Sequence, residues 1–225
     1  MEPVSELRPP TLRLPASDRR IQLLETALDV FSRKGFGGTT TKEIAAAAGV
    51  TEAIIFRHFP TKSDLYNAVL DHHHGNDRLT DCIAHWKTCM ERNDDEGLFR
   101  SMIEKVLDAH RQDLRGHRVL LFAALEGHET ALEYNRQFSY PIYELLCQYV
   151  TRRQREGALR AGDPGAIIAA AYGMAEQYAT MTQMFGFTNN TTDRQMADSF
   201  IDILMHGIQG NKQGNKQGKQ TQGAQ

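Results

Sequence analysis

The sequence predicts an all-α protein in which a small N-terminal helical domain is followed by a larger helical domain. Apolar residues recur at spacings of three and four through most of residues 18–210, as on the buried side of amphipathic helices. We find no convincing segment that alternates apolar and polar residues, which is the pattern of a strand with one buried face. Apolar residues make up 40% and charged residues 24% of the 225 residues, which is typical of globular chains.

The two ends of the chain differ in composition from the rest. Four of the seven prolines lie in residues 1–15, so we expect residues 1–17 to form a flexible arm. Residues 211–225 are rich in Gly, Gln and Lys and are expected to be a disordered tail. The first residues lack the apolar core of a secretory signal, and no apolar run is long enough to span a membrane. We therefore expect a cytoplasmic protein whose three cysteines are reduced thiols.

The first helix is expected to begin at Ser17, which can cap it, and to end at Gly35, a common residue after a helix C-terminus. Its buried side is predicted from four apolar residues at helical spacing: Ile21, Leu24, Leu28 and Phe31. An amphipathic helix of this kind needs neighbouring elements to cover its apolar side.

Two short helices are expected next. Thr40 and Glu43 form a Thr-x-x-Glu capping box at the start of the second helix, which ends at Gly49. Thr51 is expected to cap the third helix, which Pro60 stops. Two short helices joined by a short turn that contains glycine form the helix-turn-helix layout.

The remainder of the chain is predicted to be helical as well. A long helix is expected from Lys62, and Asp163-Pro164 is a strong helix start because Pro is favoured at the first helical position. Pro141 should kink or break the helix predicted around it. The expected helices after residue 90 are about 97–110, 115–124, 129–157, 165–186 and, from a cap at Thr191 or Thr192, a last helix to about residue 208.

Charge is distributed unevenly. The whole chain has a net charge of −2, but residues 19–62 hold seven Lys/Arg against four Asp/Glu, a net charge of +3. A locally basic segment on an acidic chain permits a polyanionic partner at this end without requiring one.

A series of short motifs occurs in order between residues 31 and 65: Phe31 to Phe36, Thr39-Thr40, Glu43 to Ala45, Ala48 to Thr51, Ile55 to Lys62, and Asp64-Leu65. Over about residues 19–70 the chain resembles the N-terminal DNA-binding domain of the TetR family of bacterial transcriptional regulators. The resemblance implies a DNA-binding domain over residues 18–65 and a ligand-binding and dimerisation domain over residues 66–210. It further implies a homodimeric repressor that a small apolar or amphipathic effector releases from a palindromic double-stranded DNA operator.

The resemblance carries DNA-contacting roles over to matching positions. The start of the second helix would contact phosphates, the first turn of the third helix would contact base edges, and the residues after it would contact phosphates again. The residues are Thr40, Thr41, Lys42, Thr51, Glu52, Ala53, Ile54, Phe56, Arg57, His58 and Lys62.

Three of these positions leave alternatives open. Phe56 stands where the family more often has Tyr, and a phenyl ring cannot donate a hydrogen bond to phosphate. Glu52 could accept from cytosine N4, or it could turn back toward Lys42 or solvent. Arg57 is the best candidate for a guanine contact, with a phosphate contact or a surface ion pair as the alternative.

Two sets of residues in the larger part are interpreted from the resemblance. Aromatic and Met side chains are candidates for the ligand pocket, although such residues at helical spacing are more often ordinary core; they are Trp86, Met90, Phe122, Tyr143, Met174 and Tyr178. The helix at 165–185 is apolar almost all round, so it is expected to pair with the last helix across a dimer, the alternative being a buried helix of a monomer. The candidate interface residues are Ala169, Tyr172, Met181, Met184, Phe200, Ile203 and Leu204.

The sequence gives little support to an enzyme. It contains no GxSxG, GxxxxGK[ST] or GxGxxG motif, and the His72–His74 run is interpreted as a solvated surface. Glu126, His128 and Glu129 cluster without a partner at matching spacing. We therefore expect no catalytic site, metal, cofactor or membrane contact. The alternative is a helical-bundle enzyme or metal-binding protein with an incidental helix-turn-helix-like corner.

Overall fold

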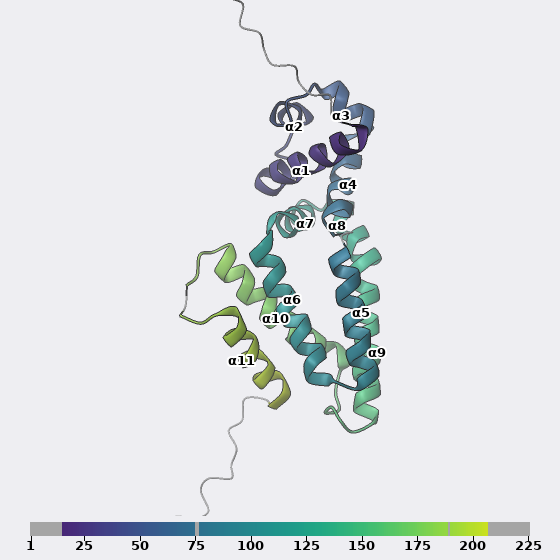
Figure 1. The fold of residues 1–225 in the computed structure, drawn as a ribbon, viewed down its shortest axis with the longest axis vertical. Coiled ribbons are helices and arrows are strands. Elements are labelled where there is room, and N and C mark those ends of the chain that lie inside the picture. Colours follow the sequence, from purple (N-terminus) through teal and green to yellow (C-terminus); the bar gives the residue numbers. More distant parts are fainter. Residues whose placement is uncertain (1–14, 75–76, 189, 207–225) are drawn as a thin grey trace, which may run out of the picture. The chain divides into compact units, whose positions relative to one another are not determined.

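The computed structural model describes residues 15–74, 77–188 and 190–206, and all regular structure in these ranges is helical (Figure 1). This confirms the predicted all-α class. The elements are α1 (Ala16–Lys34), α2 (Thr41–Ala47), α3 (Glu52–His58), α4 (Lys62–His74), α5 (Asp77–Arg92), α6 (Asp95–Gln112), α7 (Arg115–Leu125), α8 (Glu129–Tyr134), the π-helical turn η1 (Asn135–Ser139), α9 (Tyr140–Arg155), α10 (Pro164–Gln183) and α11 (Asp193–His206). Among these helices none combines the length and the apolar character that crossing a membrane requires.

The chain divides into two compact units. The first unit comprises Met1–Leu79 and Leu114–Phe138, and the second comprises Thr80–Asp113 and Ser139–Gln225. The first unit therefore contains α7 and α8 in addition to α1 to α4, whereas the sequence prediction placed all of residues 66–210 in the second domain.

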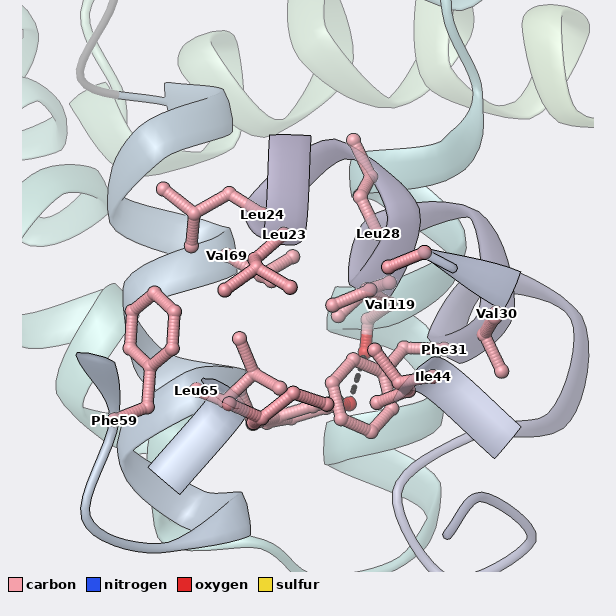
Figure 2. Close-up of a cluster of buried hydrophobic side chains, with 14 of the residues drawn as sticks. Leu23, Leu24, Leu28, Val30, Phe31, Ile44, Phe59, Leu65, Val69 and Val119 are labelled. Atoms are coloured by element: carbon pink, nitrogen blue, oxygen red, sulfur yellow. Dashed lines mark hydrogen bonds between the residues drawn. The ribbon is translucent and has the colours of Figure 1, made fainter. Parts of the chain in front are cut away.

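The core of the first unit forms where α1 packs against α4 and α7. In Figure 2, Leu23, Leu28 and Phe31 of α1 lie in one apolar cluster with Leu65 of α4 and Val119 of α7. The apolar side of α1 is covered in this way, as its helical spacing predicts. The hydroxyl of the fully buried Tyr66 donates to the carbonyl of Val119 (2.8 Å), so the polar atom that α4 brings into this core is satisfied.

The core of the second unit forms around α10, which packs against α6, α9 and α11. Ala171, Ala175 and Ala179 are buried at successive four-residue intervals along α10. Small side chains on one side of a helix let neighbouring helices approach closely, and Phe99 and Ile103 of α6 fill the same cluster.

Several predicted helix boundaries are confirmed by their caps. Thr40 and Glu43 form the predicted capping box at α2. Asp163 accepts from the amide of Gly165 (2.8 Å) at the start of α10, and the amide of Gln195 donates to the hydroxyl of Thr192 (3.3 Å) at the start of α11. Short-range signals such as these depend only on residues two or three apart, which is why the sequence reveals them.

Other boundaries differ from the prediction. The prediction of Ser17 as a cap is wrong, because α1 begins at Ala16 after Pro15 and the hydroxyl of Ser17 donates to Asp18 instead. The helix predicted over 129–157 is interrupted by η1, which ends two residues before Pro141, so the predicted break lies just before this proline, in the first turn of α9. The expected arm and tail lie largely outside the described residues, as does the predicted end of the last helix.

A buried polar pair joins α6 and α10 in the second unit. His110 Nδ1 donates to the carbonyl of Val106 (3.0 Å), and its Nε2 lies 3.2 Å from Glu176 Oε1. Burial alone would lower the pKa of His110, but the close carboxylate of Glu176, through its polar contact and its charge, and the Val106 carbonyl together raise the pKa above its ordinary value of 6.5.

This pair gives a pH prediction. A raised folded-state pKa stabilises the protein fully below the unfolded value, and the stabilisation is lost as the pH rises through the folded value. We expect wild type to be more stable than Glu176→Gln in acid, and the difference to shrink as the pH rises above 6.5 and through the raised folded-state pKa of His110, measured by thermal denaturation. A difference that does not change with pH would contradict the charged pair.

Candidate nucleic-acid interface

The corner between α2 and α3 has the geometry of a helix-turn-helix. Ala48 caps α2, and Gly49 then adopts a positive φ of 66°. A Cβ on Gly49 would meet nothing within 4 Å, so glycine is favoured here by backbone conformation and not by lack of space. The amide of Val50 donates to the carbonyl of Ala45 (2.9 Å), which closes the turn, and the fully buried Ile44 and Ile55 join the two helices to the core.

The first turn of α3 presents a mixed surface. Thr51 and Ala53 are exposed, whereas Glu52 and Ile54 are half-buried, and Ile54 packs against the core cluster. Near the end of α3, Arg57 is exposed and Phe56 has 45% of its surface exposed. Phe56 is therefore not a core residue, and its ring is accessible to a partner.

Glu52 has a partner that the sequence interpretation did not consider. The hydroxyl of Thr41 at the start of α2 donates to Glu52 Oε1 at 2.6 Å. One carboxylate oxygen of Glu52 is thus bound to α2, through Thr41 and not Lys42, and this bond leaves the second oxygen able to accept from another donor. A hydroxyl has one proton, so Thr41 cannot donate to a phosphate while it makes this bond.

Glu43 organises the start of α2. Its carboxylate accepts from the amide of Thr40 (3.0 Å) and from the ammonium of Lys34 (2.6 Å). The Lys34 hydrogen bond, followed by the Thr40 amide, lowers the pKa of Glu43 to about 2. The hydroxyl of Thr40 accepts from the amide of Glu43, so both threonines at the start of α2 have partners within the protein.

Lys62 is bound to the segment between α1 and α2. Its ammonium donates to the carbonyls of Phe36 (2.9 Å) and Thr39 (3.0 Å) and lies 4.0 Å from the centre of the Phe36 ring. The predicted phosphate contact of Lys62 stays a prediction, because most of its hydrogen-bonding capacity holds this loop in place.

The end of α7 holds the same loop from the other side. Glu126 accepts from the amides of Phe36 (3.0 Å) and Gly37 (3.2 Å), and the ring of Phe36 lies 4.4 Å from that of His128 and 5.2 Å from that of Tyr66. The sequence singled out Glu126 and His128 without finding partners for them. Their partners lie about ninety residues away in the chain, and no local spacing could reveal them.

Two arginines that the sequence interpretation missed lie beside α3. The guanidinium of Arg20 stacks 4.4 Å from the centre of the Phe59 ring. Burial lowers the pKa of His58, and the charges of Arg57, Arg20 and Arg19 lower it further. The lowered pKa favours the neutral form of His58 beside three cations, and its buried Nε2 has no hydrogen-bond partner among the described residues. The only sequence signal was the Arg-Arg pair near the start of the first helix.

Three of the six predicted ligand-pocket residues share one apolar cluster, and the other three are not part of it. Trp86 and Met90 are buried in the core of the second unit, where Tyr178 packs edge-on against Phe200. Tyr143 has 42% of its surface exposed and lines a hollow of about 430 Å³ along α9. Phe122 belongs to the first unit. Met174 is half-buried on α10.

The predicted dimer residues remain partly uncovered in the single chain. Tyr172 of α10 has 51% of its surface exposed and Ile203 of α11 has 42%, while Ala169 is also exposed. The other four, Met181, Met184, Phe200 and Leu204, are half-buried. Phe185 and Phe187 after α10, which were not predicted, are 72% and 53% exposed.

Comparisons with known proteins give one family. Residues 23–69 match the family described as "Bacterial regulatory proteins, tetR family". The chain is 30% identical over 177 residues to the transcriptional repressor Rv3405c of Mycobacterium tuberculosis, covering 73% of this chain and 78% of the repressor. It is 33% identical over 108 residues to the transcriptional activator FasR of Mycolicibacterium smegmatis, about half of each chain (48%).

Solved structures share the fold over most of the chain. NalD, the secondary repressor of the MexAB-OprM multidrug efflux pump in Pseudomonas aeruginosa, aligns with a TM-score of 0.62 at 22% identity and covers 86% of this chain and 97% of NalD. AibR in complex with isovaleryl coenzyme A and operator DNA aligns with a TM-score of 0.57 at 22% identity and covers 83% of this chain and 98% of AibR.

Proposed function

Because this chain belongs to the TetR family of bacterial transcriptional regulators, we propose that α2, α3 and the start of α1 bind a double-stranded DNA operator. The observation that carries the proposal is the α2–α3 corner, whose second helix has partly exposed residues in its first turn and ends among three arginines. A helix of this size fits the major groove, and the arginines are suited to the phosphates beside it.

We assign roles within this surface by chemistry. Arg57, Arg20, Arg19 and the exposed Lys42 would contact phosphates, and Arg57 could also reach a guanine. Thr51, Ala53 and Ile54 would face base edges, while Phe56 would pack against sugar. Thr40, Thr41, His58 and Lys62 would position the helices, since their polar groups serve the protein or are buried.

We propose further that the chain acts as a homodimer through α10 and α11. One short recognition helix gives weak specificity, and a two-fold dimer presents two helices about 34–36 Å apart to a palindrome. The exposed Tyr172, Phe185 and Ile203 supply apolar surface for that contact.

Repression and effector release complete the proposal. Rv3405c and NalD are named repressors, which favours repression over the activation named for FasR. AibR was solved with both isovaleryl coenzyme A and operator DNA. We propose that a small apolar or amphipathic effector binds the second unit and favours a state in which the two recognition helices no longer fit adjacent half-sites. The protein would act in the cytoplasm, where the chromosome lies. The alternative of an enzyme or metal-binding bundle is not favoured.

The DNA-binding surface is tested with Arg57→Ala in the full chain. We expect about ten-fold weaker binding to DNA selected from genomic fragments, and a binding constant less dependent on salt, because each subunit loses a phosphate or base contact. Fluorescence anisotropy titrations at several salt concentrations measure both.

Arg160→Ala is the matched control, since Arg160 is an exposed arginine of the second unit. Its affinity and salt dependence should equal those of wild type. If the two substitutions weakened DNA binding equally, or if Arg57→Ala did not weaken it, the DNA would not bind at the end of α3.

A further inference from the structure

We propose that Glu52, held in place by Thr41, selects a cytosine in each half-site of the operator. The proposal rests on the proposed function and names one determinant of its sequence specificity. Thr41 and Glu52 are the first residues of α2 and α3, and the 2.6 Å hydrogen bond between their side chains links the two helices of the corner.

The hydrogen bond fixes where the acceptor lies. A carboxylate has two oxygens and about four lone-pair sites, so Oε1 can accept from Thr41 while Oε2 still accepts from a partner. A free glutamate could rotate away from the DNA phosphates into solvent. Glu52 is half-buried and hydrogen-bonded to Thr41, which restricts this rotation. Binding to DNA then requires little further loss of conformational freedom in the Glu52 side chain.

The charge of Glu52 makes it selective. The neighbouring Lys42 and Arg57 are cationic and exposed, but among the described residues Glu52 has no basic partner in an ion pair. A carboxylate near the DNA backbone weakens binding to all sequences by repulsion. This loss of binding free energy is offset only where a base donates a hydrogen bond to the carboxylate. The difference in affinity between sites with and without such a base is the specificity.

The chemistry of base edges identifies the base. Cytosine presents its N4 amino group in the major groove with no acceptor on the same base beside it. Adenine presents N6 next to its own N7 acceptor, while guanine and thymine present acceptors only, apart from the thymine methyl. A carboxylate is therefore best matched by cytosine, less well by adenine because of the neighbouring N7, and is opposed by the acceptors of guanine and thymine.

The test is selection from randomised DNA by the full chain, followed by sequencing. Wild type should select cytosine at one symmetric position of the two half-sites. In Glu52→Gln this preference should fall about five-fold or more, while affinity for unrelated DNA should rise because the repulsive charge is gone. In Thr41→Val the preference should weaken without that rise, because the carboxylate remains but is no longer held.

Glu96→Gln provides the same chemical change on an exposed residue of the second unit and should alter neither measurement. Thermal denaturation verifies that each variant is folded. If wild type selects DNA and Glu52→Gln keeps the same base preferences, or loses a preference for another base, the cytosine assignment is overturned. If wild type selects no DNA at all, the proposed function fails and this proposal fails with it.

Discussion

Gly35→Ala is expected to lower the free energy of unfolding of the first unit by about 3 kcal/mol. Gly35 has φ 70° and ψ −177°, a region that is essentially restricted to glycine. A Cβ at this position would also overlap Glu126 Oε1 and lie 2.9 Å from Phe122 Cδ1. Backbone strain and overlap therefore act together, and chemical denaturation of the full chain measures their sum.

The same substitution should weaken DNA binding. Displacing Glu126 removes the acceptor for the amides of Phe36 and Gly37, in the loop that leads to the start of α2. Binding titrations at a temperature where the variant remains folded measure this effect separately from stability.

Two glycine controls separate the causes. Gly37→Ala would bring a Cβ to 3.5 Å from Glu126 Oε1, an ordinary contact, and should change little. Gly157 has a φ of 76° but open space around it. Gly157→Ala should therefore lower the free energy of unfolding only by the cost of a positive φ, about 1–2 kcal/mol. If Gly35→Ala were as stable as Gly37→Ala, the close approach of α7 to this loop would be wrong.

Asp95→Ala is expected to lower the free energy of unfolding of the second unit by about 2–3 kcal/mol, because Nε and Nη2 of the largely buried Arg153 and the hydroxyl of Tyr149 lose their acceptor, while Glu156 still accepts from Arg153 Nη1. Asp95 accepts from Arg153 Nε (2.9 Å) and Nη2 (2.9 Å) and from the hydroxyl of Tyr149 (2.5 Å). The side chains of Asp95 and Arg153 are only 12% and 13% exposed. These bonds join the start of α6 to the end of α9.

The pH dependence of this effect has a definite sign. Burial opposes ionisation of Asp95, but the hydrogen bonds from Arg153 and Tyr149 and the nearby charges hold its pKa below its ordinary value of 3.8. The stabilisation is therefore present above that value and is lost as the pH falls through the lower folded-state pKa.

Glu96→Ala is the matched control on the adjacent residue. Glu96 pairs with Arg100 at 3.1 Å, but its side chain is 58% exposed, so its removal should change stability by less than about 1 kcal/mol. Thermal and chemical denaturation of both variants should separate them clearly. Equal losses would show that burial does not strengthen the Asp95–Arg153 pair.

The helix-turn-helix corner could be predicted from the sequence because its signals are local. The capping box of Thr40 and Glu43 spans three residues, and the breaks at Gly49 and Pro60 are properties of single residues. The contacts that adjust the corner are not local. Thr41 and Glu52 are eleven residues apart, Lys62 and Phe36 are twenty-six, and Glu126 and Phe36 are ninety.

The larger part was less predictable for a different physical reason. Helical spacing shows which side of a helix is apolar, but not whether that side faces a cavity, a neighbouring helix or solvent. Tyr143 and Phe122 illustrate this, because one lies exposed on α9 and the other on α7 in the first unit. The grouping of α7 and α8 with the first unit likewise depends on contacts such as Tyr66 with Val119, which join distant parts of the sequence.

Hydrogen–deuterium exchange of the full chain with and without its selected DNA locates the DNA-binding surface most directly. DNA on the α2–α3 surface should slow amide exchange across residues 41–58, while exchange along α9 should stay as it is in the free protein. Unchanged exchange across residues 41–58 at saturating DNA, with slowing elsewhere in the chain, would contradict the account.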